Sequence, residues 1–384
     1  MEYYDVVIIG GGPSGLSTAL HLQRFAPQLT PRILILEKGH YPRPKLCAGA
    51  LVADAEIILE RLGLDVSEVP HTDAHSAHFD YAGNGLTLRL AGRHTLRIVR
   101  RDEFDAWLAK KAQSRGLEIH EGVTVKSVQP DDDGVAIETD HGAYCAKLVI
   151  GADGSNGMVR RCVLPNAPVF TARVLEVLTP LYPHPPTREK RNGAAYLDFF
   201  PVPDGIAGYT WDFPTQVKGQ PMRCWGIYDT NILADGKRPP LKEPLAAEMA
   251  RFGFDLGHYE LKGHPIRWFN PFNPFSVPRV LLVGDAVGVD SLFGEGISMA
   301  LGYGNLAARE AAQALSRDDF SLTGYKRRVL LSPLGQTLLA RWLLTYIIYP
   351  LRWKWFQFLL WRVMQPVVFI VSWIFVLNWA RRMK

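Results

Sequence analysis

The sequence predicts an α/β protein built from three parts, and three observations lead to this fold class. First, an apolar segment at residues 4–9 runs into a glycine-rich turn, a helical pattern and a second apolar segment at 32–37. Second, residues 165–275 are rich in proline and aromatic residues and contain runs in which apolar residues alternate. Third, residues 331–384 are apolar and rich in tryptophan. We therefore expect a Rossmann-like nucleotide-binding domain, an inserted and mostly antiparallel β-sheet domain, and a C-terminal hydrophobic helical tail.

The glycine-rich turn has the spacing G-x-G-x-x-G, which is typical of dinucleotide binding when a strand precedes it and a helix follows. Gly10 allows a tight turn, Gly12 allows the backbone to approach a pyrophosphate, and Gly15 allows the helix to pack closely on the sheet. Pro13 and Ser14 begin the helix, whose free N–H groups and positive dipole end favour phosphate. This turn is the predicted phosphate-binding end of the site.

The second apolar segment ends in an acidic residue, Glu37, at the distance expected for a ribose-binding carboxylate. A carboxylate at this position accepts hydrogen bonds from ribose hydroxyls and repels a 2′-phosphate. Strand, turn, helix and acid together favour dinucleotide binding over the alternative, which is a glycine-rich turn in another kind of α/β unit.

Beyond this unit, the patterns alternate between the nucleotide-binding domain and the inserted sheet. The predicted elements are helices at 52–63, 102–113 and 297–315, short strands within 76–99, strands at about 117–128 and 134–150, strands within 194–200, 209–213 and 223–228, and a buried strand at 280–283. The predicted boundaries place the nucleotide-binding domain at 1–75, 100–164 and 276–330, strands of the inserted sheet at 76–99, the inserted domain at 165–275 and the tail at 331–384.

Charge is distributed unevenly along the chain, which carries a formal net charge of +5. Residues 320–384 contain ten Lys or Arg and no Asp or Glu, whereas the rest of the chain has 33 basic and 38 acidic residues. The same tail holds six of the ten tryptophans. Tryptophan mixed with basic residues beside aliphatic runs is typical of a membrane interface, so we expect an anionic membrane surface as partner and no nucleic acid.

The tail admits several arrangements. Residues 363–380 are uncharged and long enough to just cross a bilayer, whereas residues 342–351 are too short to cross alone. We favour a hairpin or helices lying in the interface on the cytoplasmic side of the membrane, as a peripheral or monotopic protein. The alternative is a hydrophobic dimer interface. A chain that ends near Ser332 is expected to keep its nucleotide-binding site, because every nucleotide-binding motif precedes that residue.

Three later segments favour a flavin nucleotide over a nicotinamide. A strand pattern ends at Asp153-Gly154, and another ends at Gly284-Asp285, where a carboxylate can hold ribityl or ribose hydroxyls. Gly294-Glu295-Gly296-Ile297 then opens a helix whose N–H groups can stabilise negative charge on a reduced flavin. The sequence therefore predicts FAD as cofactor.

These motifs occur in an ordered set that resembles the p-hydroxybenzoate-hydroxylase-like FAD superfamily over about residues 1–315. The set consists of G-x-G-x-x-G with Glu37, R-x-x-F-D beginning at Arg101, GADGSNGMVRR and VGDAVGVDSLFGEGI. Within that superfamily, PRPKLCAGAL at 42–51 and YTWDFP at 209–214 are similar to motifs of the geranylgeranyl reductase family. The chain departs from that family in having Ala48 where glycine is usual, and in its long hydrophobic tail.

The resemblance implies an FAD-dependent oxidoreductase that reduces carbon–carbon double bonds of a prenyl or isoprenoid lipid by hydride transfer from flavin N5. It implies that the FAD site also includes Lys38, Lys45, Ala48, Arg101 and Val125. The external electron donor is expected to be NAD(P)H or a protein carrier, since no separate nicotinamide domain is predicted. The alternatives are an FAD-dependent monooxygenase or epoxidase acting on a lipid, and a non-catalytic flavoprotein that carries a lipid.

An unactivated alkene must be held flat over the flavin in a dry pocket. Tyr209, Trp211 and Phe213 alternate on a strand pattern and are expected to share one face. They are candidates for the pocket wall, with Tyr209 and Trp211 assigned to catalysis, although aromatic residues at alternate positions also occur in ordinary sheet cores. Cys47 is a candidate proton donor, or alternatively a small buried hydrophobe. The predicted pocket also includes Pro214 and Gly49.

Two other patterns are not assigned to the site. The histidines at 71, 75 and 78 have metal-like spacing, but we interpret this segment as a solvated polar loop and predict no metal. The glycines at 302 and 304 imitate a second dinucleotide turn, but no strand precedes them, so we expect helix packing there.

Overall fold

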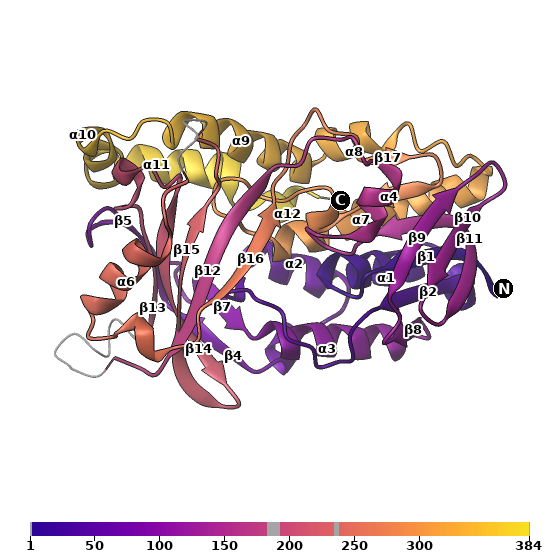
Figure 1. Ribbon diagram of the computed structural model, residues 1–384, viewed down its shortest axis with the longest axis horizontal. Helices are drawn as coiled ribbons and strands as arrows, with labels where there is room; N and C mark the ends of the chain where they lie inside the picture. The colour runs from indigo at the N-terminus through magenta and orange to yellow at the C-terminus, as the bar shows by residue number, and fades with distance from the viewer. Residues whose placement is uncertain (1, 183–192, 234–237, 384) are drawn as a thin grey trace.

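The protein, seen in a computed structural model that describes residues 2–182, 193–233 and 238–383, is elongated and has two main sheets beside each other along its long axis (Figure 1). The nucleotide-binding part lies on the right of that view and the inserted sheet on the left. The C-terminal helices run along the top of both parts. The fold class expected from the sequence is therefore present: a Rossmann-like α/β part with an inserted, mostly antiparallel sheet.

The eight-stranded sheet forms the nucleotide-binding part. Its strands are β1 (Glu2–Ile9), β2 (Ile33–Glu37), β8 (Glu118–Glu121), β9 (Val125–Pro130), β10 (Val135–Thr139), β11 (Gly142–Gly151), β17 (Ser276–Val277) and β18 (Val280–Leu282). β1 lies between β11 and β2 and is parallel to both, and β18 is parallel to β11. Because carboxyl ends of parallel strands meet at one edge, the turns after β1, β2, β11 and β18 converge there.

Helices cover this sheet and contact one another through glycine. They are α1 (Pro13–Phe25), α2 (Ala53–Arg61), α3 (Arg101–Gln113), α4 (Met158–Val163), α7 (Ile297–Arg317) and α8 (Tyr325–Leu331). A Cβ atom on Gly304 of α7 would lie 2.4 Å from Ser17 Oγ of α1, and one on Gly302 would lie 2.5 Å from the Trp379 indole. The expectation that these glycines serve helix packing is confirmed.

Two strands expected to be continuous are interrupted. The segment expected at 117–128 is divided between β8, which pairs with β2, and β9, which pairs with β10. The segment expected at 134–150 is a hairpin that turns before Gly142, whose φ of +120° suits glycine. Both breaks fall at polar residues followed by glycine, Glu121-Gly122 and Asp140-His141-Gly142, which are turn signals that divide each apolar segment.

The second sheet has seven strands in the order β16-β12-β15-β14-β13-β5-β6. Their bounds are β5 (Ser76–Asp80), β6 (Gly85–Leu88), β12 (Thr171–Thr179), β13 (Ala194–Asp198), β14 (Gly208–Val217), β15 (Gln220–Asp229) and β16 (Lys262–Arg267). All neighbouring pairs are antiparallel except β13 with β5. Helix α6 (Lys242–Ala250) lies beside this sheet on the side away from the nucleotide-binding part (Figure 1).

The segment at 76–99 contributes to two sheets. β5 and β6 join the seven-stranded sheet, whereas β7 (Leu96–Val99) pairs with β3 (Ala50–Leu51) and β4 (His71–Ala74) in a small third sheet. The interpretation of residues 71–80 as a polar loop is wrong, because β4 and β5 satisfy their backbone groups by pairing with β7, β6 and β13. Within the described ranges, no group of three His, Cys, Asp or Glu residues is arranged to hold a metal.

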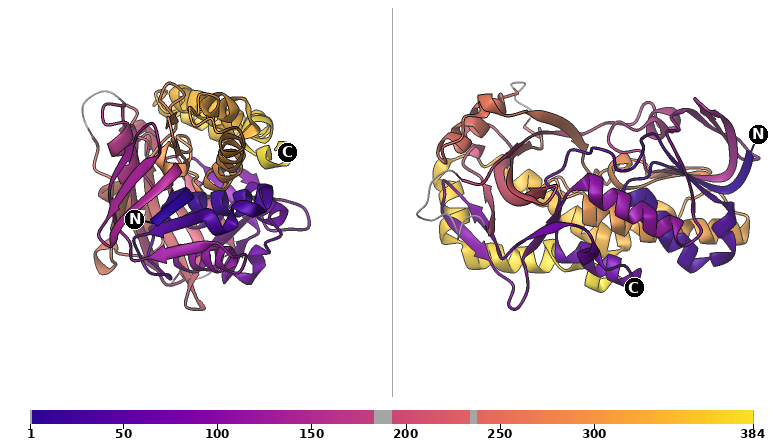
Figure 2. Two further views of the ribbon diagram at one scale, coloured as in Figure 1. Left: turned by 90° about the vertical axis from the view of Figure 1, so that its right-hand side faces the viewer. Right: turned by 90° about the horizontal axis from the view of Figure 1, so that it is seen from below.

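The tail forms helices that lie along the body as a hairpin (Figures 1 and 2). They are α9 (Pro333–Ile348), α10 (Lys354–Phe358), the π-helical η6 (Leu359–Val363), α11 (Gln365–Val371), the π-helical η7 (Ser372–Val376) and α12 (Trp379–Arg382). Across the described part of the chain, no single helix has the length and apolarity to span a membrane. The helical segments at 354–363 and 365–382 meet those criteria only as a pair, bent by 76°.

The end of the tail returns to the nucleotide-binding part. Trp379 is fully buried, and the Asp54 carboxylate of α2 accepts hydrogen bonds from the backbone N–H groups of Asn378 and Ala380 at 3.0 and 2.7 Å. Arg61 donates to the backbone oxygen of Ala380 at 2.7 Å. These contacts are contrary to the expectation that a chain ending near Ser332 leaves the nucleotide-binding part intact, because the tail fills part of its core.

Candidate active site

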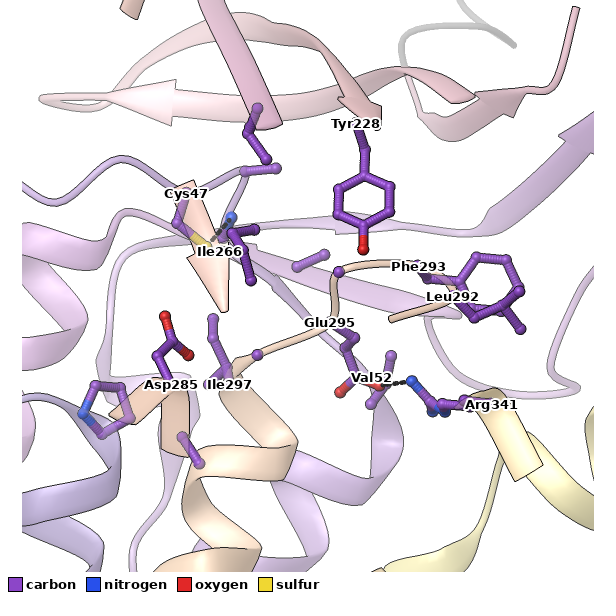
Figure 3. Close-up of a pocket in the computed structure, with 18 of the residues that line it drawn as sticks. Cys47, Val52, Tyr228, Ile266, Asp285, Leu292, Phe293, Glu295, Ile297 and Arg341 are labelled. Carbon is purple, nitrogen blue, oxygen red and sulfur yellow. Dashed lines mark hydrogen bonds and ion pairs between the residues drawn. The ribbon is translucent and has the colours of Figure 1, made fainter. Parts of the chain in front are cut away.

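A cavity of about 1200 Å³ lies where the two main sheets and the tail meet. Its walls are the carboxyl edge of the eight-stranded sheet, the inner face of the seven-stranded sheet and the side of the tail that faces the body. Figure 3 shows the region where these walls come together, around Cys47, Asp285, Tyr228 and the Glu295–Arg341 pair. The cavity therefore has a nucleotide end, with exposed backbone groups, and an apolar end.

The turn after β1 forms the phosphate-binding end. Gly12 lines the cavity, and no side chain caps the first turn of α1. A Cβ atom on Gly10 would lie 2.4 Å from Ala152 O, and one on Gly15 would lie 2.0 Å from Gly10 O. Uncapped helical N–H groups beside a close backbone turn match the chemistry of a pyrophosphate, so this end fits FAD.

Glu37 is buried at the edge of the same turn. Its carboxylate accepts hydrogen bonds from the backbone N–H groups of Gly11 and Gly39, both at 2.9 Å, and pairs with Arg43 Nε at 3.1 Å. Its position on the cavity wall fits a ribose hydroxyl. Arg43 was not among the predicted site residues, and its position between the Glu37 and Asp105 carboxylates depends on the tertiary fold.

Arg101 lines the cavity from the start of α3. Its guanidinium makes a bidentate pair with Asp105, at 2.8 and 2.9 Å, and Asp105 is also 3.3 Å from Arg43 Nη2. Two parallel hydrogen bonds to one carboxylate fix the orientation of the Arg101 guanidinium. The R-x-x-F-D motif thus places one positive charge on the cavity wall.

The turns after β11 and β18 form the middle of the cavity. Asp153 lines it, but its Oδ2 accepts a hydrogen bond from Val159 N at 2.8 Å, and burial raises the pKa of this carboxyl. Ser155 Oγ donates to Asp285 Oδ2 at 3.2 Å. Asp285 therefore offers its carboxylate to the cavity, while Asp153 mainly holds the loop that begins α4.

The loop before α7 carries a buried ion pair to the tail. Arg341 of α9 donates to Glu295 Oε2 at 2.8 Å, as Figure 3 shows, and to Asp290 Oδ2 at 2.6 Å. Asp290 also accepts from the N–H groups of Leu292 and Phe293, at 2.7 and 3.2 Å. One tail residue thus fixes the loop that presents Gly294, Gly296 and the uncapped start of α7 to the cavity.

Lys45 and Cys47 lie on the segment between β2 and β3. Lys45 Nζ is 2.7 Å from His264 Nε2, and burial lowers the pKa of Lys45. Burial and then the Lys45 charge lower the pKa of His264 to about 4, so at neutral pH the ammonium donates to a neutral imidazole. Cys47 Sγ accepts a hydrogen bond from Gly49 N at 3.4 Å. Gly49 has a φ of +78°, and a Cβ atom at this position would lie 1.8 Å from Val99 O, so only glycine fits here.

The aromatic strand β14 provides the apolar wall. Tyr209, Trp211 and Phe213 are buried and all line the cavity, as their alternation predicts. The Tyr209 hydroxyl donates to Phe293 O. Pro214 does not line the cavity, because the residue after Phe213 points to the other face of the strand, so its assignment to the pocket is wrong.

The tail supplies the rest of the apolar wall, which the sequence analysis did not assign to the site. Trp361 stacks on Phe199 with ring centroids 3.9 Å apart. Further apolar residues of the tail, from α9 to α11, line the same end, namely Leu344, Ile347, Ile348, Phe356, Leu360, Met364, Val367 and Val368. This wall of the cavity is thus formed by residues more than 100 positions from β14 in the sequence.

Most predicted site residues lie together on the cavity wall. These are Gly10, Gly12, Pro13, Ser14, Glu37, Lys38, Lys45, Cys47, Ala48, Gly49, Arg101, Val125, Asp153, Gly154, Tyr209, Trp211, Phe213, Asp285, Gly294, Glu295, Gly296 and Ile297. Gly15 and Gly284 lie behind the wall, where they permit close packing against Gly10 O and Ser14. The sequence analysis missed Arg43, Asp290, Arg341, His264 and Glu176; only Arg341, a lone cation in an apolar helical stretch, gives a local signal.

The fold and the nucleotide end define a flavin-binding oxidoreductase. Residues 3–296 match the family model described as FAD binding domain, and the chain belongs to that family. It is 28% identical over 337 residues to digeranylgeranylglycerophospholipid reductase 3 of Methanosphaera stadtmanae, covering 83% of this chain and 79% of the relative. It is also 28% identical over 367 residues to protein FixC of Escherichia coli, covering 87% and 83%.

Solved structures share the fold. A geranylgeranyl bacteriochlorophyll reductase-like protein of Thermoplasma acidophilum matches with a TM-score of 0.77 at 22% identity, covering 99% of this chain and 95% of that one. The halogenase PltM, in complex with phloroglucinol and FAD, matches with a TM-score of 0.63 at 16% identity, covering 90% and 76%. The protein is thus an FAD-dependent oxidoreductase that resembles the geranylgeranyl reductases.

Proposed function

We propose that this oxidoreductase adds hydrogen across carbon–carbon double bonds of the prenyl chains of a lipid. The observation that carries the proposal is the apolar end of the cavity, which opens directly into the FAD-binding end. Similarity to a reductase whose name specifies a geranylgeranyl lipid supports the same substrate class. Bound FAD, once reduced by an external donor such as NAD(P)H or a protein carrier, supplies a hydride from N5.

The residues of the chain then bind and orient the lipid. Tyr209, Trp211 and Phe213 offer ring faces against which a flat, apolar alkene can lie. The tail residues opposite them exclude water, which a reaction at an unactivated bond requires. Arg341 offsets the charges of Asp290 and Glu295, so the loop beside the flavin site keeps its position within an apolar surrounding.

We propose that the lipid enters from a membrane on whose cytoplasmic side the tail lies. Of the seventeen large apolar side chains that are exposed in the described part of the chain, thirteen belong to residues 331–384. Exposed tryptophans beside basic residues, such as Trp353 and Trp355 around Lys354, support attachment to an anionic lipid surface. A soluble protein rarely exposes an apolar area of this kind without a partner.

The direct test is anaerobic. Protein reduced with dithionite is mixed with a geranylgeranyl-chain phospholipid in detergent micelles, and the product mass is measured. We expect the lipid to gain two hydrogen atoms per double bond without oxygen. A monooxygenase would instead require oxygen and add one oxygen atom to the lipid, and that product would contradict the proposal. A lipid-carrying flavoprotein would give no product under either condition.

A further inference from the structure

A single carboxyl group interrupts the apolar wall on strand β12. Glu176 is 4% exposed, lines the cavity and faces it together with Val174, two residues earlier on the same strand. Its Oε2 has no hydrogen-bond partner among the residues that the structure describes, and the Cys224 thiol on β15 hydrogen-bonds to the carboxyl group. A buried carboxyl with an uncommitted oxygen is costly, so its presence in this wall calls for a function.

The position of Glu176 is linked to Trp211. In the register of the sheet, Glu176 lies opposite Gly226 of β15, and Gly226 lies opposite Trp211 of β14. A Cβ atom on Gly226 would lie 2.0 Å from Trp211 Cζ2 and 2.4 Å from Leu175 O. The indole therefore occupies the space above Gly226 and extends across β15 toward β12. A prenyl chain that lies on the Trp211 indole is therefore close to the side of the wall that carries the Glu176 carboxyl group.

Burial of the Glu176 carboxyl allows it to keep a proton near neutral pH. Burial raises the pKa of its carboxyl to about 7, although Arg100, Cys224 and Lys262 of the neighbouring strand β16 act in the opposite direction. The ordinary pKa of a glutamate side chain is 4.5, so the protonated form is populated here at pH values where an ordinary glutamate is ionised. Glu176 lines the cavity, and its buried Oε2 is not committed to another group that the structure describes.

The other proton-bearing groups of this wall are engaged. The Tyr209 hydroxyl donates to Phe293 O, and the Tyr228 hydroxyl donates to Ser291 O at 2.9 Å. Burial raises the pKa values of both phenols further, which makes them weaker acids. Cys47, the proton-donor candidate from the sequence, also lines the cavity, from the segment between β2 and β3, where its Sγ accepts a hydrogen bond from Gly49 N at 3.4 Å.

We propose that Glu176 is the general acid of the reduction, and this inference rests on the proposed function. As one alkene carbon receives a hydride from the reduced flavin, the Glu176 O–H bond breaks and its proton forms a C–H bond at the other carbon. The double bond becomes a single bond, the flavin is oxidised by two electrons, and the carboxylate is reprotonated from water. Atoms and electrons balance with reduced flavin as the only reductant.

The test compares Glu176→Gln with wild type in a single turnover. Dithionite-reduced protein is mixed anaerobically with the geranylgeranyl-chain phospholipid in micelles, and flavin reoxidation is followed together with product mass. We expect Glu176→Gln to retain FAD content and thermal stability but to lower the reoxidation rate about 10²-fold or more, as general acids contribute. The wild-type rate should fall as pH rises through about 7, whereas the variant rate should lose this dependence.

A second measurement needs no lipid. The infrared difference spectrum of the FAD-bound protein between acidic and alkaline pH should contain a protonated-carboxyl band that titrates near neutral pH and is missing in Glu176→Gln. Glu103→Gln is the matched control, because burial also raises the pKa of Glu103, but its carboxylate accepts from Gln216 Nε2 at 2.7 Å outside the cavity wall. This control should keep both the rate and the band.

The outcomes separate the two proposals. If wild type reduces no prenyl lipid, the proposed function fails, and the proton-donor role fails with it even if the infrared band is found. If wild type reduces the lipid and Glu176→Gln does so at the same rate, only the role of Glu176 is contradicted. If Glu176→Gln lacks FAD or unfolds, Glu176→Asp is measured instead. Its shorter carboxyl group should retain part of the wild-type rate and the pH dependence. If it retains neither, the proposal is wrong.

Discussion

The two ends of the cavity are built by different means. At the nucleotide end, backbone groups of short turns after β1, β11 and β18 form the surface, and each turn is a local motif. At the apolar end, side chains of β12, β14, α9 and η6 meet, although they are separated by many residues in the sequence. The first end depends on where the backbone turns, and the second depends on which side chains the complete fold brings together.

This difference predicts how amino-acid substitutions at each end affect the protein. A backbone turn is specified by glycines and by the strand before it, so it is reproduced wherever that motif occurs. The apolar end depends on the packing of the tail, which Arg341 holds through the buried Asp290 and the partly buried Glu295. Changes at the apolar end should therefore affect folding or substrate positioning, whereas changes at the nucleotide end should affect FAD binding alone.

The largest effect is expected from Arg341→Ala. The substitution leaves the buried Asp290 and the partly buried Glu295 without their cation, and breaking a buried pair such as Arg341–Asp290 costs about 3–5 kcal/mol in the free energy of unfolding. Urea denaturation of the FAD-bound protein measures the loss. Arg327→Ala, on the exposed side of α8, is the control and should change stability by no more than about 0.5 kcal/mol. Equal stability of the two variants would show that the tail does not hold the loop.

Trp211→Ala should separate positioning from cofactor binding. Because Trp211 lies on the apolar wall and not in the nucleotide turns, we expect turnover per bound FAD to fall about 10²-fold while FAD content changes little. Trp225, a buried tryptophan of the same sheet that donates to Thr179 Oγ1 away from the cavity, provides the control Trp225→Ala. If turnover and FAD content of Trp211→Ala fall equally, Trp211 belongs only to the structural core.

Glu37→Gln tests the nucleotide end in the same way. The neutral amide cannot replace a carboxylate that accepts two backbone N–H groups and pairs with Arg43, so FAD binding should weaken by about 1.5–3 kcal/mol. Fluorescence titration of the apoprotein with FAD measures the dissociation constant. Glu138→Gln on β10, exposed and outside the cavity wall, should leave it unchanged. Unchanged binding in Glu37→Gln would remove Glu37 from the site.

The smallest effect concerns the membrane. Lys354→Gln removes one exposed charge between Trp353 and Trp355, and each basic residue near an anionic surface contributes about 1 kcal/mol. Sedimentation with vesicles that contain anionic lipid should show correspondingly weaker binding, and the difference should vanish with neutral vesicles. Lys242→Gln on α6, which lies away from the tail, is the control. Equal binding by both variants would contradict attachment through this part of the tail.

The sequence by itself determined the nucleotide end. The positions of Gly10, Gly12 and Glu37 follow from a strand–turn–helix pattern whose contacts are nearly all between neighbours in the sequence or adjacent parallel strands. The shared face of Tyr209, Trp211 and Phe213 was predictable for a similar reason, since strand alternation is a local property. Pro214 was misplaced because similarity to a motif does not indicate which face a residue occupies.

Only the tertiary structure decided how the apolar end is closed. Helical periodicity identifies an apolar tail, but it does not indicate whether that tail covers the body or leaves it. The choice depends on long-range partners: Asp54 for the backbone at Ala380, Asp290 for Arg341, and Phe199 for Trp361. These partners are far apart in the sequence, and no local sequence pattern relates them. The wall that surrounds the proposed substrate therefore forms only when the whole chain is packed.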